Sequence, residues 1–132
     1  MKNFSHTSRS LIAAFLLSIP PAALAGSTDY EFQLVHSSVP QGPEALVSVL
    51  LKDKRTGKPV PDAVIFATRL DMAPEGMEAM TTTLDPLPSD EAGVYRFKAN
   101  LPMEGGWRFK LAVKMQGEPE TVQGELVLQA KP

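Results

Sequence analysis

The chain has 132 residues, and its 15 acidic and 13 basic residues give a formal net charge of −2, so one domain of ordinary size is expected. An acidic balance without a basic cluster argues against a nucleic acid as partner, because phosphate binding needs a basic surface. The absence of cysteine excludes disulfides, thiolate metal ligands and cysteine nucleophiles, so the stability of the domain has to come from its core.

The first 25 residues are predicted to be a secretory signal peptide. Lys2 and Arg9 precede the apolar run LIAAFLLSIPPAALA, which ends in an Ala-x-Ala sequence. This order is typical of a cleavable export signal, and the run is shorter than the about 20 residues that span a bilayer. An uncleaved membrane anchor is the alternative. We expect a single domain over residues 26–132, with a net charge of about −4, in the periplasm and without a membrane span after cleavage.

Short segments with period-two alternation follow in chain order. Strands are expected at residues 30–37, 44–53, 60–70, 93–101, 106–115 and 120–130, with a weaker one at residues 79–84. Glycines and prolines mark the turns between them, including residues 40–43, which we expect to separate the first two strands. The pattern predicts an all-β fold, an immunoglobulin-like antiparallel β-sandwich of about seven strands, with Trp107 packed between the sheets.

No combination of residues indicates catalysis. His36 is the single histidine after the predicted signal peptide, and a surface position at a strand end is its ordinary interpretation. Ser37 and Ser38 follow it, but neither lies on a nucleophile elbow. The acidic residues in the middle of the chain lack the spacing of a calcium-binding loop. We therefore expect the protein not to be an enzyme.

Methionine is the residue type with distinctive chemistry in this chain. The stretch RLDMAPEGMEAM carries Met72, Met77 and Met80, with a proline and a glycine that interrupt regular structure, and Met103 lies in the second turn LPMEGGW. The thioether is a soft, uncharged ligand that favours Cu(I) and similar ions. If the two turns meet at one end of the sandwich, their sulfurs converge on a site for Cu(I) or Ag(I), and Trp107 adds a cation–π contribution.

Two other interpretations of the methionines stay open. Methionine is an adaptable filler of cores; Met72 would then end a strand facing inward, and Met77 and Met80 would pack against Trp107. Alternatively, an exposed methionine loop acts as a flexible hydrophobic contact for a protein partner in the cell envelope.

The run GKPVPDAVIFATRLDMAPEGMEAM, followed by GVYRFKANLPMEGGWRFKLAV, resembles the FixH-like or YtkA-like family of small exported bacterial domains. The elements that carry the resemblance are GKPV.DA at the start of a strand, the methionine loop after it, GVY, and LPM.G.W, in that order. The resemblance implies an immunoglobulin-like sandwich in the periplasm and a role in copper handling. By position, it implies Met72, Met77, Met80 and Met103 as metal ligands, with Trp107 as their neighbour.

The resemblance allows two settings, heavy-metal efflux or the assembly of copper-containing respiratory oxidases. Typical FixH proteins keep an N-terminal transmembrane anchor, whereas this apolar run ends at a cleavage-like sequence. We therefore expect a soluble periplasmic accessory protein that binds Cu(I) or Ag(I) and serves a heavy-metal efflux adaptor or another copper-delivery partner. The alternative is a protein-interaction module that binds no metal.

Overall fold

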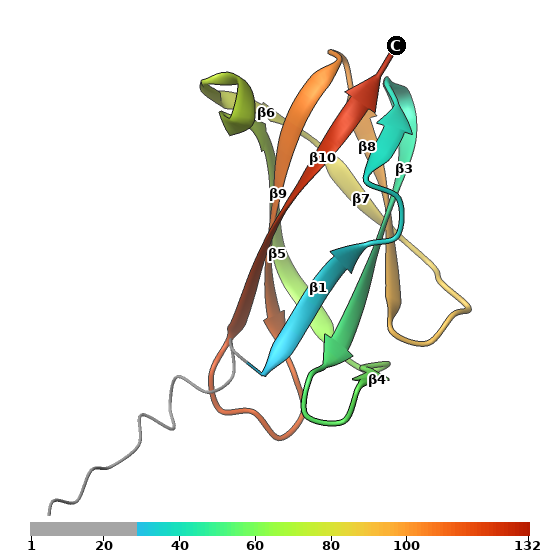
Figure 1. Ribbon diagram of the computed structural model, residues 1–132, viewed down its shortest axis with the longest axis vertical. Coiled ribbons are helices and arrows are strands. Elements are labelled where there is room, and N and C mark those ends of the chain that lie inside the picture. The colour runs from blue at the N-terminus through green and yellow to red at the C-terminus, as the bar shows by residue number, and fades with distance from the viewer. Residues whose placement is uncertain (1–28) are drawn as a thin grey trace, which may run out of the picture.

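The computed structural model describes residues 29–132, so the predicted signal peptide lies outside the described residues. The described chain forms two five-stranded sheets that face each other (Figure 1). Sheet A has the order β1 (Tyr30–Leu34), β3 (Gly42–Asp53), β8 (Val94–Leu101) and β7 (Leu84–Leu87), and β4 (Lys58–Pro59) pairs with β3. Sheet B has the order β2 (Ser38–Pro40), β10 (Val122–Lys131), β9 (Gly105–Lys114), β5 (Val64–Met72) and β6 (Met77–Thr82).

The predicted all-β sandwich is confirmed. Seven of the strands in residues 29–132 have five residues or more, and these correspond to the seven expected from the alternation. The short strands β2, β4 and β7 were not expected from the sequence. One short helix, η2 (Ala73–Glu75), joins β5 to β6.

Residues 40–43 do not separate the first two long strands as expected. Pro40 instead ends β2, which pairs in parallel with β10, and β3 begins at Gly42. Gln41, between them, donates its N–H to the Lys131 carbonyl oxygen at 2.7 Å. The proline is tolerated because β2 is an edge strand of sheet B, where a missing N–H need not break the ladder.

Alternating residues of β9 form the centre of the core. Trp107, Phe109, Leu111 and Val113 are all buried, and Trp107 lies in the core, as predicted. Phe109 meets Phe97 of the opposite sheet edge to face, with ring centroids 5.3 Å apart. Burial of each such side chain stabilises the fold by about 1.5–3 kcal/mol.

The chain changes from sheet B to sheet A between β6 and β7. Thr82 Oγ1 donates a hydrogen bond to the Asn100 carbonyl oxygen at 2.6 Å, and the Asn100 N–H donates to the Thr83 carbonyl oxygen at 3.3 Å. As a result, β6 pairs with β5 only at Leu70, Asp71 and Met72.

No helix among residues 29–132 is long and apolar enough to cross a membrane.

Candidate functional site

The first methionine turn is a hairpin made of β5, η2 and β6. Met72 and Met77 are Cα partners across it, next to a register shift between Asp71 and Met72. Pro74 lies in the first turn of η2, and Gly76 follows in the left-handed region with φ 76°, where its N–H donates to the Ala73 carbonyl oxygen at 2.9 Å. Glycine suits this position because it has no Cβ to clash there. The proline and the glycine therefore shape the turn, as the sequence indicated.

The second methionine turn, between β8 and β9, lies directly against the first. The Gly106 N–H donates a hydrogen bond to Glu75 Oε2 at 2.8 Å. A Cβ added to Gly105 would lie 3.2 Å from Met72 Cε, so the backbone of the second turn touches the side chain that ends β5. The Trp107 indole N–H donates to the Met103 carbonyl oxygen at 3.0 Å and fixes the same turn from inside. The two turns thus share one end of the sandwich.

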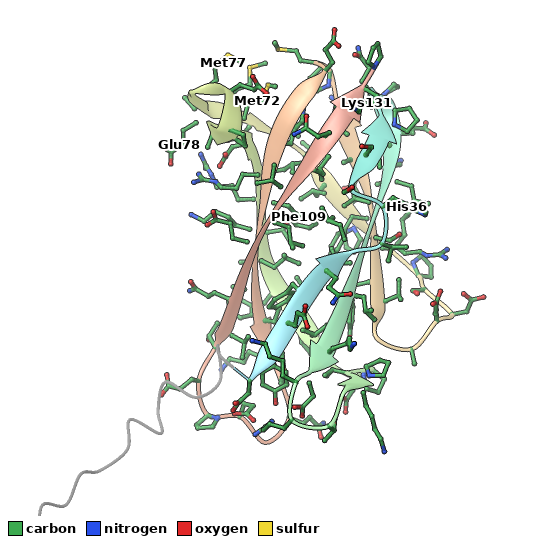
Figure 2. The ribbon with its side chains drawn as sticks, in the orientation of Figure 1. His36, Met72, Met77, Glu78, Phe109 and Lys131 are labelled. Carbon is green, nitrogen blue, oxygen red and sulfur yellow. The ribbon has the colours of Figure 1, made fainter. Side chains whose placement is uncertain are left out.

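The four methionines predicted as ligands differ in their exposure. Met72 is fully buried in the core, and Met80 is partly buried against it. Met77 and Met103 are each 38% exposed. Met72 thus has the inward-facing strand-end position that the packing interpretation described. Figure 2 shows Met72 and Met77 at the same end of the sandwich.

His36 lies away from the methionines. It is exposed in the link after β1, and Figure 2 shows it on the opposite side of the sandwich from Met77. Its surface position agrees with the ordinary interpretation of a single histidine at a strand end.

A buried carboxylate, Asp71, holds the methionine hairpin to the sheet. Asp71 and Arg108 are Cα partners across β5 and β9, and Arg108 Nη2 donates to Asp71 Oδ2 at 2.8 Å. Arg69 Nε donates to the same oxygen at 2.7 Å, and the Ala73 N–H donates to Asp71 Oδ1 at 3.0 Å. Arg108 also reaches Glu78 Oε2 at 3.1 Å, and Arg69 bonds the Glu78 carbonyl oxygen at 2.9 Å. These contacts join the two arms of the hairpin, β5 and β6, to each other and to β9.

The charges in this cluster stabilise one another. Burial of Asp71 by itself would raise its pKa, but the hydrogen bonds from Arg108, the Ala73 N–H and Arg69 together lower the pKa to about 2. The hydrogen bonds to Asp71 and then to Glu78 raise the pKa of Arg108. The Asp71 carboxylate is therefore charged at neutral pH although its side chain is fully buried.

The sequence interpretation did not identify this cluster. In the sequence, Asp71, Glu75 and Glu78 belong to the acidic middle of the chain, and nothing local distinguishes them. Arg69 and Asp71 stand two residues apart in β5 and therefore share a face, but the predicted strand ends at Leu70, one residue before Asp71. The pairing of Asp71 with Arg108 depends on the register of β5 against β9, which no local pattern reveals.

The side-chain donors at this end of the sandwich differ from those of the common metal sites in proteins. Among residues 29–132, no group of three or more histidine, cysteine, aspartate or glutamate side chains is placed to hold a metal ion. The methionines of the two turns carry thioethers, a donor type that suits monovalent soft ions such as Cu(I).

Comparisons with known proteins concern the family and the fold. A family model described as YtkA-like matches residues 24–112, a range that includes both methionine turns. The search of curated proteins found no match. A DUF4426 family protein from Pseudomonas aeruginosa PAO1 has a similar crystal structure, with a TM-score of 0.50 and 14% identity over 78% of this chain and 89% of that chain. The Lin-41 filamin domain has a TM-score of 0.43 and 17% identity, over 71% of this chain and 89% of its own. At 14% identity, the first likeness shows the fold alone.

Proposed function

Since the chain belongs to the YtkA-like family, we propose that it is a soluble periplasmic accessory protein that binds Cu(I) or Ag(I) between its two methionine turns. It would buffer the ion or pass it to a heavy-metal efflux adaptor. The observation that carries this proposal is the contact between the turns, in which Glu75 bonds Gly106 and Met72 lies against Gly105. Without that contact, nothing would hold the turn that carries Met103 close to the methionine hairpin.

The methionine end combines accessible donors with a fixed scaffold. Met77 and Met103 are partly exposed and offer sulfur to an arriving ion or partner, whereas Met72 and Met80 are the more buried donors. The bonds of Asp71 and Glu75 hold the turns in place, and fixed ligands lose less freedom on binding. Thioethers also bind no protons, and unlike free thiols they cannot be oxidised to disulfides. These properties suit ion buffering in an oxidising compartment.

Binding is tested by a Cu(I) titration under reducing conditions, in competition with a chromogenic chelator. The emission of Trp107, the single tryptophan in the sequence, gives a second readout through its bond to the Met103 carbonyl. We expect the triple variant with leucine at positions 72, 77 and 80 to lose binding and keep its fold, because leucine nearly conserves the volume of methionine.

The matched control is Met115→Leu, which makes the same chemical change at a buried methionine that follows β9. This variant should bind Cu(I) as the wild type does. The proposal fails if the wild type binds Cu(I) no more tightly than the triple leucine variant.

A second candidate function is a hydrophobic contact with an envelope protein that needs no metal. The partial exposure of Met77 and Met103 favours it, because flexible thioethers adapt to varied surfaces. Leucine at positions 77 and 103 should spare such a contact while it abolishes metal binding. Glutamate at the same two positions should abolish the protein contact as well as metal binding. An envelope partner that is retained equally by the wild type, the leucine variant and the glutamate variant would contradict this second function.

A further inference from the structure

A groove between β5 and β8, separate from the methionine end, has a cavity volume of about 700 Å³. Its lining comes from residues 65–68 of β5, residues 86–87 of β7 and residues 89–97, which include the start of β8. The groove follows from the change of sheet after β6. The chain leaves sheet B at the end of β6 and continues as β7 in sheet A, so no strand runs alongside the first part of β5 on this side among the described residues.

The edge of β5 along this groove has no partner strand among the described residues. Residues 64–71 pair with β9 on one side, whereas β6 reaches only residues 70–72 on the other. An uncovered strand edge presents free N–H and C=O groups to another chain. Sheets usually protect such edges with charged residues, proline or β-bulges. Here a register shift interrupts the ladder with β9 between Ile65 and Ala67, but the residues on both sides of it are apolar. We therefore regard residues 64–69 as a strand edge that is open to pairing.

Exposed apolar side chains surround the same groove. Phe66 is 54% exposed and Leu87 37%, and both line the groove. Val64, next to the lining residue Ile65, is 61% exposed. The register shift between Ile65 and Ala67 leaves Phe66 without a Cα partner on β9, and Phe66 lines the cavity. An open strand edge beside an apolar cavity suits β-strand addition, in which an extended peptide pairs with the edge of a sheet. Backbone hydrogen bonds then give affinity, and alternate side chains of the peptide enter pockets.

The accessible charge of the groove is negative. Asp90 and Glu91 line it, are exposed, and form no ion pair with the described residues. Arg96 also lies in the lining but is only half-exposed. A peptide with basic residues complements this rim, whereas an acidic peptide is repelled.

We infer that this groove binds an extended, apolar peptide segment with lysine or arginine at its ends, which adds to β5 as a further strand. The partner is then a protein with an exposed or unstructured segment of that chemistry. This inference does not depend on metal binding, because the groove shares no residue with the methionine turns.

The probe is a fluorescent peptide of eight residues, with alternating valine and threonine between two terminal lysines. We expect saturable binding by fluorescence anisotropy, and amide shifts in the NMR spectrum at residues 64–69. A peptide with N-methylated central residues should lose binding, because it cannot form the backbone ladder.

Phe66→Ser should weaken binding of the peptide about tenfold through lost apolar contact. Leu46→Ser, at a side chain that is 48% exposed and outside the groove, should leave it unchanged.

A reversal of the rim charge separates specific docking from general stickiness. The double variant Asp90→Lys with Glu91→Lys should weaken the lysine-ended peptide, and strengthen a glutamate-ended peptide, by about three- to tenfold at low salt. Both positions are exposed loop residues, and the circular dichroism spectrum verifies the fold. The inference is overturned if Phe66→Ser and the charge reversal leave peptide binding unchanged. It is also overturned if the free protein is a dimer that Phe66→Ser dissociates, since a second copy would then cover the edge.

Discussion

Replacement of Asp71 by asparagine tests whether the buried carboxylate holds the methionine hairpin in place. The change keeps the shape of the side chain but removes the charge that Arg108 and Arg69 contact at 2.8 and 2.7 Å. Loss of one partner from a buried ion pair costs about 3–5 kcal/mol. The Arg108 side chain is 17% exposed and that of Arg69 45%, so water compensates for part of the loss. We therefore expect Asp71→Asn to lower the free energy of unfolding by about 2–3 kcal/mol.

The assay is urea denaturation at pH 7, followed by the emission of Trp107. Asp53→Asn is the matched control, because Asp53 also pairs with an arginine at 3.1 Å, but its partner Arg55 is 50% exposed. Ion pairs at the surface contribute about 0–1 kcal/mol, so the control should lose less than about 1 kcal/mol. If Asp71→Asn costs no more than Asp53→Asn, the hairpin does not depend on the buried carboxylate.

The stability difference between the wild type and Asp71→Asn should depend on pH. The pKa of Asp71 is lowered from 3.8 to about 2 by its three donors, which outweigh the effect of burial. A lowered pKa in the folded state stabilises the protein above the unfolded value, and this stabilisation is lost as the pH falls through the folded value. The difference in unfolding free energy between wild type and Asp71→Asn should therefore shrink as the pH falls from about 4 to about 2. A difference that stays constant over this range would contradict the assignment.

Three further predictions concern the methionine end. Gly106→Ala would bring a Cβ 3.0 Å from Pro74 Cβ, so it should lower the melting temperature and change the emission of Trp107. Gly57→Ala also costs stability, because Gly57 has a φ of 74°, but nothing lies within 4 Å of the added Cβ, so it should leave that emission unchanged. Equal spectra for both variants would contradict the close packing of the turns. In urea titrations, Met72→Ala should lower the unfolding free energy by about 2–5 kcal/mol, and Met72→Leu by less than about 1.5 kcal/mol. Equal losses of unfolding free energy for the two variants would contradict tight packing around Met72. Cu(I) affinity, measured by chelator competition, should be constant from about pH 5 to 8, because thioethers bind no protons. A tenfold rise across this range would instead indicate a histidine ligand, since histidine loses its proton in this range.

The long strands were predictable because each carries its own signal. In β9, four apolar side chains alternate with others over residues 107–113, and period two identifies such a strand without knowledge of its partners. β2 and β7 have only three and four residues, too few for a period to show. Pairing with β10 or β8 determines them, and that information lies far away in the sequence.

The candidate site was predictable only in part for the same reason. Residue chemistry selected the methionines, and the proline and glycine of the hairpin indicated a turn. The contact of Glu75 with Gly106 joins residues 31 positions apart, and the pairing of Asp71 with Arg108 joins residues 37 positions apart. Both depend on the order and register of strands in sheet B, so they become visible only when the fold is known.

The position of β10 in sheet B has a consequence for how the chain folds. β10 lies between β2 and β9, so the last strand among residues 29–132 pairs with one of the first. Until residues 122–131 are free to pair, the core lacks Val122, Leu128 and Ala130, all of which are buried. Pairings this distant in sequence slow folding, because the loop between them must close first. The sandwich is therefore complete only after residues 122–131 have joined sheet B.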